Sequence, residues 1–531
     1  MGEDETTRPD WPLTRRAFVG TASAAAIAGC LDVDIGDDLT RLEFVTARPP
    51  LTLDPFQVGD AGSAHVVNQV VEGLYEYDTD LELVPKLAMG SPEVSRSGSR
   101  YVVPIDDAAA FPGGDPVEAA DVVHSFTAPR ADPTPAGRQM TMIADVSAID
   151  VQTVQFDLSY PYPAFPSVLT SYVVPRDLPA VPDAEQTEAP TARLVGSGPF
   201  EFDTRLDDGG VRLTNRGNYW DDPSPAIDGV EFRPVPEGTK RVITVKTSEA
   251  DVIDEIPPAV WDTLTGLDTV NLASTAGLGY YYLGFNCRDG PAADPRVREA
   301  IDYAVDLDRA VADAVDPLGD RLYAPVPDQV ADAWSFPTEE WATIPHDRDI
   351  DRAATLLDES DAVPPDWEAT LIVPPDDTRE QLCEAVAAGI RAAGYRARVD
   401  RLDWQTFADT YTRGDPTAYD AYCLGWIDAP DPDRYLHPLF GPQAAGRTDG
   451  TYYTAVADIL QAARETPDPA ERRTHYLQAI ETLLTDRAHL PLYTHPQTLG
   501  MVTAVEDIGT HPLDGFVLVG HGYNVTITAE E

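Results

Sequence analysis

Lysine is nearly absent from this chain of 531 residues, which contains only Lys86, Lys240 and Lys246. Its 90 acidic residues outnumber 38 basic residues and give a formal net charge of −52. A chain this anionic repels nucleic acids and anionic membrane surfaces, so electrostatic binding to either is excluded. At about 1 M salt the Debye length falls to roughly 3 Å and screens such repulsion. We interpret the composition as adaptation to a high-salt medium; an acidic protein without that adaptation is the alternative.

Cysteine is scarce, and no two cysteines have the CxxC spacing of a redox or zinc motif. This predicts buried small side chains or free thiols at Cys287, Cys383 and Cys423. The nine histidines show no HxxxH or HExxH spacing, and the GxSxG and P-loop motifs are missing. The sequence therefore predicts no catalytic residue, no metal and no cofactor.

Two segments could be taken for ligand sites. Gly196-Ser197-Gly198-Pro199 could form a nucleophile or phosphate turn, but no helix pattern follows it, which favours a turn that enters a strand. Asp428, Asp431 and Asp433 could suggest calcium, but the prolines between them favour an extended loop.

Long hydrophobic runs are also missing. The run at residues 17–29 is shorter than the ~20 residues of a membrane span and suits a signal-peptide core. Arg15 and Arg16 precede it, as in a twin-arginine (Tat) export signal, and Cys30 follows small residues, as in a lipobox. We expect residues 1–30 to be a signal peptide ending in a lipidated Cys30, and residues 31–40 to be an acidic tether. A retained N-terminal arm is the alternative.

The remaining chain shows the patterns of an α/β protein. Residues 42–46 read as a strand, and Ala64, Val67, Val70, Val71 and Leu74 have helical spacing. Asp294-Pro295 and Asp468-Pro469 are helix starts. Residues 369–373, 382–394 and 397–402 read as strand, helix and strand, which predicts a parallel pair with a right-handed crossover.

Aromatic residues gather in the second half, at Tyr280-Tyr281-Tyr282 and around Trp404 and Trp426. Aromatic rings with a polar group suit the wall of a cleft that holds a partly apolar solute. Packing in an ordinary core is the alternative for each of them.

A set of short motifs, in order along the chain, resembles the extracellular solute-binding proteins of family 5, which serve dipeptide and oligopeptide ABC importers. Each motif alone is degenerate, but the ordered set is hard to obtain by chance. The motifs are Leu53-Asp54-Pro55, Val71-Glu72-Gly73-Leu74-Tyr75, residues 84–88, 111–117, 120–126, 196–200, Asn218-Tyr219-Trp220, residues 281–286, 294–301, Gly425-Trp426, Asp431-Pro432-Asp433 and residues 490–493.

The resemblance implies a two-lobed periplasmic-binding-protein fold of type II, with a small extra domain inserted in the first lobe. Lobe I then comprises residues 41–76, 175–275 and 498–531. The inserted domain comprises residues 77–174, and lobe II comprises residues 276–497.

The resemblance also implies that Asp428, shortly after Trp426, pairs with the amino terminus of a peptide ligand. The loop after Trp426 is one residue shorter than usual in the family. Cys423 stands near the place where some oligopeptide binders carry a basic residue for the ligand's carboxylate. The candidate ligand-binding residues are Tyr280, Tyr281, Tyr282, Asn286, Trp404, Cys423, Trp426 and Asp428.

We therefore expect the substrate-binding protein of an ABC importer, a monomer anchored by lipid to the outer face of the cell membrane. It would capture a peptide-like solute between its lobes and deliver it to the permease subunits and their ATPases, without catalysis. A sugar, a metal chelate or an opine on the same fold is one alternative. A secreted hydrolase with an unrecognised site is another.

Overall fold

A computed structural model describes residues 40–131, 134–178 and 194–528 of the chain. The predicted export signal, lipobox and most of the tether lie outside the described residues. None of the helices in the described part combines the length and apolar character that crossing a membrane requires.

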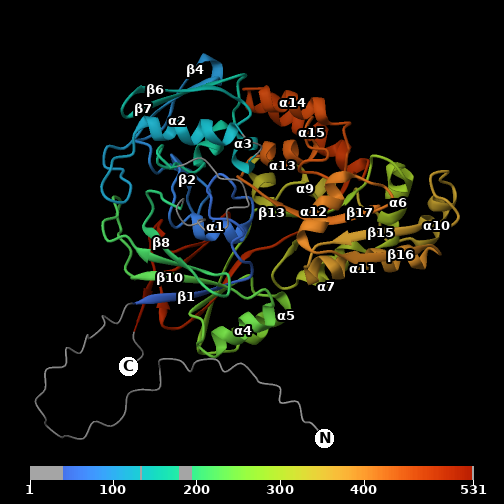
Figure 1. Ribbon diagram of the computed structural model, residues 1–531. Coiled ribbons are helices and arrows are strands. Elements are labelled where there is room, and N and C mark those ends of the chain that lie inside the picture. Colours follow the sequence, from blue (N-terminus) through green and yellow to red (C-terminus); the bar gives the residue numbers. More distant parts are fainter. Residues whose placement is uncertain (1–39, 132–133, 179–193, 529–531) are drawn as a thin grey trace, which may run out of the picture. The chain divides into compact units, whose positions relative to one another are not determined.

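Lobe I is built on a seven-stranded mixed sheet whose strands come from distant parts of the chain (Figure 1). β1 lies at its centre and pairs in parallel with β10 and β11. In spatial order the strands are β12 (Val270–Thr275), β19 (Gln497–Val502), β11 (Val252–Asp254), β1 (Arg41–Thr46), β10 (Gly229–Pro234), β9 (Val211–Asn215) and β8 (Phe200–Arg205). Short hairpin strands of the C-terminal segment complete this lobe: β20 (Val505–Glu506), β21 (Gly509–His511), β22 (Gly515–Val517), β23 (Val519–Gly520), β24 (Tyr523–Asn524) and β25 (Thr526–Ile527).

Lobe II is built on a six-stranded sheet. β15 pairs in parallel with β16 and with β17, whereas β13 is antiparallel to β17 and β18. In spatial order the strands are β14 (Asp320–Arg321), β18 (His489–Thr494), β13 (Gly279–Phe285), β17 (Ala421–Ile427), β15 (Glu368–Val373) and β16 (Arg396–Arg401).

A smaller domain contains a four-stranded antiparallel sheet and a two-stranded one. The first has the order β4 (Glu93–Ser95), β5 (Arg100–Pro104), β7 (Thr153–Leu158) and β6 (Ile143–Asp150). The second pairs β2 (Tyr75–Tyr77) with β3 (Leu83–Pro85).

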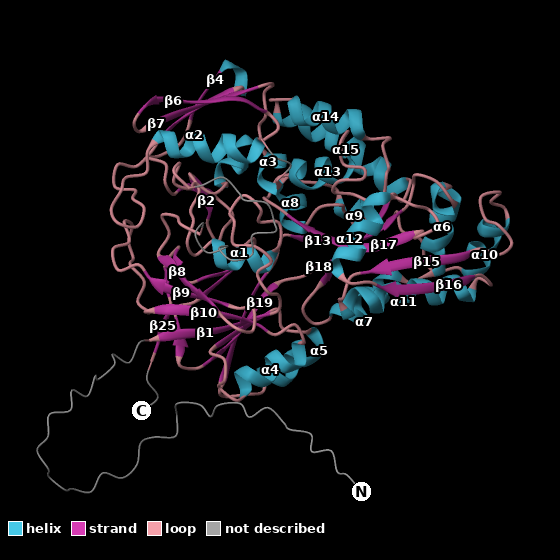
Figure 2. Cartoon of the chain, in the orientation of Figure 1, coloured by secondary structure: helices cyan, strands magenta, loops and turns pink. Residues whose placement is uncertain are grey.

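Helices cover both faces of the lobe II sheet (Figure 2). Helices α6 (Pro295–Ala304), α7 (Leu307–Val315), α10 (Ile350–Asp358) and α11 (Asp377–Ala392) pack on one face. The opposite face carries α8 (Asp328–Ala333), α9 (Thr338–Trp341), α12 (Trp404–Arg413), α13 (Pro432–Phe440), α14 (Ala457–Glu465) and α15 (Pro469–Thr485). Lobe I holds α1 (Ala61–Val67), α4 (Gly238–Lys246) and α5 (Pro258–Thr265), and the small domain holds α2 (Ala119–Thr127) and α3 (Pro135–Gln139).

Buried hydrophobic residues form four clusters. One fills lobe I, one fills the small domain between Leu74 and Val173, and two lie on the opposite faces of the lobe II sheet. The clusters support the predicted domain boundaries, which stay a proposal.

The chain enters and leaves lobe II at one place. It passes from β12 to β13 and returns from β18 to β19. The Thr494 hydroxyl donates to the Gly277 carbonyl at 3.2 Å, and a Cβ on Gly277 would lie 2.3 Å from the His495 carbonyl oxygen. The two connecting segments therefore touch, and Gly277 is required by their close approach.

Most predicted elements are confirmed. The strand at residues 42–46, the helix starts at Asp294 and Asp468 and the parallel strand–helix–strand unit from residue 369 are all present. The helix expected through Leu74 ends at Val67 instead. The reason is that the carbonyls of Gln69, Val70 and Glu72 accept hydrogen bonds from Phe200, Gly198 and Val173, so this backbone pairs with other segments.

Candidate functional site

The carboxyl ends of β15, β16, β17 and β18 and the amino end of β13 share one edge of the lobe II sheet. This edge is where α/β sheets usually bind ligands. Trp404 follows β16, Trp426 lies at the end of β17, and Tyr281 lies near the start of β13. The structure thus brings these three predicted residues, with Asp428, to one edge.

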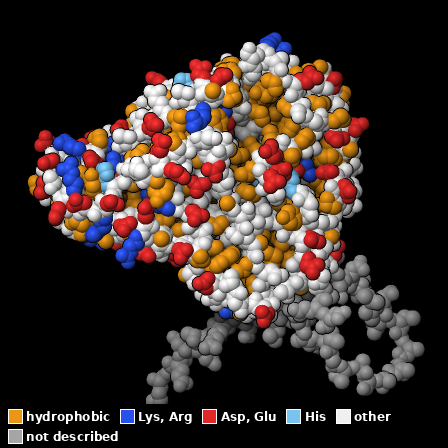
Figure 3. All heavy atoms as spheres, turned by 180° about the vertical axis from the view of Figure 1, so that it is seen from behind, with side chains coloured by type: hydrophobic (Ala, Val, Ile, Leu, Met, Phe, Trp, Pro, Cys, Tyr) orange, Lys and Arg blue, Asp and Glu red, His pale blue; other side chains and the backbone are white. Residues whose placement is uncertain are grey.

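Two apolar side chains at this edge are exposed. Trp404, at the first position of α12, is 47% exposed, and Ile427, at the end of β17, is 42% exposed. A large apolar side chain left in water at a ligand edge is more informative than one elsewhere on a surface. Figure 3 shows hydrophobic side chains gathered around a hollow near the top of that view.

Tyr281 lies at the centre of a stack. Its ring is parallel to that of Tyr493, with centroids 4.5 Å apart, and the Arg379 guanidinium lies 5.1 Å from its centroid. A Cβ on Gly425 would lie 2.4 Å from the Tyr281 ring. The glycine before Trp426 is therefore required because Tyr281 covers its backbone.

Four other predicted site residues are inside lobe II, which departs from the expectation that they line a cleft. Tyr280 and Tyr282 are fully buried, because neighbours in a strand point to opposite faces and theirs is covered by α12 to α15. The Tyr282 ring stacks on His489 at 3.8 Å. Asn286 donates to the Tyr419 carbonyl at 3.5 Å, and Cys423 packs beneath α11.

Trp426 is half-buried, and its indole N–H donates to the Arg434 carbonyl at 2.9 Å. Asp428 is a partner of the same residue, since the Arg434 Nε–H donates to its Oδ1 at 2.8 Å. Burial raises the pKa of Asp428, against the charge of Arg434. Arg434 also donates to Gln139 of α3 at 3.1 Å. The Trp426–Asp428 loop is thus tied to the small domain.

The other two acids of the suggested calcium cluster have arginine partners of their own. Arg472 forms a bidentate ion pair with Asp431, with N–O distances of 2.6 and 2.9 Å. Arg464 forms a bidentate ion pair with fully buried Asp433, with N–O distances of 2.7 and 3.1 Å. The Tyr162 hydroxyl of the small domain also donates to Asp433, at 2.7 Å. Burial opposes ionisation of Asp433, but the charge and hydrogen bonds of Arg464 outweigh it and hold the pKa of Asp433 well below its usual range. Asp431 and Asp433 are therefore the anionic members of structural ion pairs.

The three cysteines in the described part are free, as predicted, and Cys383 and Cys423 are buried. A hydrogen bond with Cys423, in which the Cys383 thiol is the donor, and burial raise the pKa of Cys383. Gly198 precedes β8, and its N–H donates to Val70, so the Gly196–Pro199 segment forms the expected entry into a strand.

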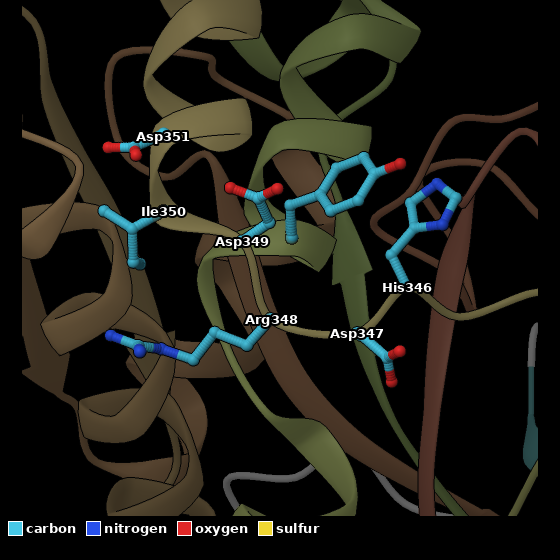
Figure 4. Close-up of a pocket in the computed structure, with 7 residues that line it drawn as sticks. His346, Asp347, Arg348, Asp349, Ile350 and Asp351 are labelled. Carbon is cyan, nitrogen blue, oxygen red and sulfur yellow. The ribbon is translucent and has the colours of Figure 1, made fainter.

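A shallow polar pocket lies elsewhere, between α6 and the start of α10 (Figure 4). Tyr303 stacks on His346 at 3.9 Å, and the residues from Asp347 to Asp351 complete the lining. None of the predicted site residues lines this pocket.

Sequence reasoning missed Arg379. It occupies the third position of α11, beside Tyr281, and its side chain is 7% exposed. No local signal sets it apart, because Arg309 and Arg352 occupy the same third position of α7 and α10.

Known proteins resemble this chain over nearly its whole length. The glutathione-binding protein GsiB of Shigella dysenteriae is 27% identical over 482 residues, covering 89% of this chain and 90% of that protein. The structure of DppA from Helicobacter pylori, in complex with the peptide STSA, superposes with a TM-score of 0.77 at 22% identity and covers 92% of this chain and 98% of that one. AgaA of A. tumefaciens R10, in complex with agropinic acid, gives 0.78 at 23% identity, covering 92% and 99%.

These structures confirm the predicted two-lobed fold of the periplasmic binding proteins. The family model described as bacterial extracellular solute-binding proteins, family 5 Middle, matches residues 82–447. This chain belongs to the family 5 extracellular solute-binding proteins.

Proposed function

We propose that this protein captures peptides or peptide-like solutes between its two lobes and delivers them to the permease of an ABC importer. The observation that carries the proposal is the match along 89% of the chain to a glutathione-binding protein, together with the ligand edge of lobe II. The two touching connectors are suited to a hinge closure that hides a solute from water. An extended peptide could form hydrogen bonds to the protein through its main chain, and this mode of binding tolerates varied side chains on the ligand.

Asp428 is the proposed partner of a ligand amine. Arg434 holds the carboxylate at the ligand edge through Oδ1, and 13% of the Asp428 side chain is exposed. In this proposal Trp404, Tyr281 and Trp426 supply the apolar wall.

Melting curves of the purified protein with dipeptides, tripeptides and glutathione test the proposal. A ligand at about a hundred times its dissociation constant adds roughly 2.7 kcal/mol to the free energy of unfolding. Asp428→Asn should lose that stabilisation for ligands with a free amine, because it keeps the shape and removes the charge. Asp409→Asn, at an exposed helix position, is the matched control. Equal stabilisation of Asp428→Asn and the parent would exclude Asp428 as the amine partner.

An opine is the second candidate ligand, supported by the likeness to AgaA in complex with agropinic acid. Adding opines to the same panel separates the two, since stabilisation by an opine alone contradicts the peptide proposal. Turnover of peptides during the assay would contradict our inference that the chain is a binding protein and not an enzyme.

We also propose that Tat exports the protein and that lipid at Cys30 anchors it. The twin arginine, the short apolar run and the small residues before Cys30 support both steps. Arg15-Arg16→Lys-Lys should stop export, and Cys30→Ala should release a soluble protein into the medium. Cell fractionation measures both, and a Cys30→Ala protein that stays on the membrane would contradict the anchor.

A further inference from the structure

Arg379 has donors that its surroundings do not use. Its side chain is 7% exposed, and its Nε and Nη1 have no hydrogen-bond partner within the part of the chain that the structure describes. Buried guanidinium donors are almost always hydrogen-bonded, so the buried Nη1, which has no acceptor, points to a group that binds there.

The nearest carboxylate, Asp376, pairs with the Nε side of the guanidinium only. Asp376 caps α11, its Oδ1 accepting the backbone N–H of Arg379 at 2.9 Å, while its Oδ2 lies 3.4 Å from the arginine Nε. The Tyr281 ring holds one face of the guanidinium. Arg379 is thus held rigidly, with the Nη1 donor left for another acceptor.

We propose that Arg379 is an anion-binding residue of the ligand cleft, donating through Nη1 to a carboxylate of the solute. This inference rests on the proposed function and narrows its ligand class. The solute carries a carboxylate near the Tyr281 face, which excludes neutral sugars and fully amidated peptides as its best ligands.

The experiment compares tripeptides and glutathione with their carboxamide forms, and acidic opines and sugars with their neutral forms, by calorimetry at high salt. The acids should bind at least ten times more tightly than their neutral partners, which is the usual worth of a hydrogen bond between charged groups. Arg379→Gln should weaken the acids by the same factor and leave the neutral forms unchanged. Arg379→Lys, a point charge without the guanidinium fork, should be intermediate.

Arg391→Gln is the matched control, because Arg391 lies on the same helix, is exposed and pairs with Glu384. Melting without ligand shows whether Arg379→Gln is folded. Equal affinity for acids and neutral forms, or an equal loss of both in Arg379→Gln, would overturn the inference and leave solute binding intact. Acidic opines that bind through Arg379 in place of peptides would support the inference and contradict the peptide proposal.

Discussion

At the residue scale, the buried pair between Asp433 and Arg464 ties lobe II to Tyr162 of the small domain. Asp433→Asn leaves Arg464 buried without its counter-charge. We expect the free energy of unfolding to fall by about 3–5 kcal/mol, the usual cost of breaking a buried pair. Urea unfolding measures it, with Asp313→Asn as the control, because Asp313 forms an exposed pair with Arg309. A change of less than about 0.5 kcal/mol, as expected of the control, would contradict a structural role for Asp433.

The same pair predicts a pH dependence. The pKa of Asp433 is lower in the folded protein than the value of about 4 expected when unfolded. Its contribution is therefore complete above about pH 4 and is lost as the pH falls through the folded pKa. The difference in stability between the parent and Asp433→Asn should shrink below pH 4. Because both proteins carry the other carboxylates, comparing their free energies of unfolding cancels the effect of those groups. A difference in free energy of unfolding that stays constant from pH 7 to 3 would contradict the prediction.

The ligand edge shows what single residues allow one to predict. Trp404 and Trp426 stand out in the sequence as clustered aromatic residues, and Asp428 is found through the resemblance to family 5, because it follows the Gly425-Trp426 motif. The partners of Asp431 and Asp433 cannot be found from the sequence, since Arg464 and Arg472 lie on later helices and Tyr162 lies 271 residues before Asp433. The burial of Tyr280 and Tyr282 depends on which face of β13 the later helices cover, and that is a property of the assembled sheet.

At the scale of elements, helix starts are the most predictable feature. Asp294 and Asp468 cap α6 and α15 through their own side chains, and such caps act within a few residues. The segment after α1 shows the opposite case. Its apolar spacing is helical, but residues 172–173 and 198–200 pair with its backbone, and no local signal reports partners so distant.

The packing of α11 on α6 depends on Gly389. A Cβ there would lie 2.3 Å from the Ala304 carbonyl oxygen. Gly389→Ala gains about 1 kcal/mol of helix propensity, but we expect the forced separation to outweigh it and to destabilise the protein by about 1–2 kcal/mol.

Gly266→Ala is the control for Gly389→Ala. Gly266 ends α5 and has negative φ, and a Cβ added to it would have no atom closer than 3.8 Å. Denaturant unfolding compares the two variants. A Gly389→Ala protein more stable than the parent would show that the helices separate without cost.

At the scale of the whole molecule, charge repulsion is the dominant liability. The formal net charge is −52, and acidic side chains are scattered over the surface (Figure 3). We propose that the protein is adapted to high salt and expect it to unfold on dialysis below about 0.1 M salt, where the Debye length exceeds roughly 10 Å. Circular dichroism during a salt titration measures this.

Sucrose at matched osmolality serves as the control for the salt titration. It should not replace salt, because a neutral solute does not screen charge. A native spectrum in dilute buffer would contradict the adaptation.

The touching connectors at Gly277 and Thr494 have a consequence for folding cooperativity. When lobe I is folded it holds both ends of lobe II together, so unfolded lobe II is a closed loop of about 220 residues. Closing that loop lowers the conformational entropy of the unfolded segment and raises its free energy by about 5 kcal/mol. When lobe II is folded, it holds the segments of lobe I on either side of it together, so the unfolded state of lobe I loses conformational entropy in the same way. Each lobe thus stabilises the other through chain connectivity alone. The protein can hold its cleft open to solvent and still fold and unfold as a single unit.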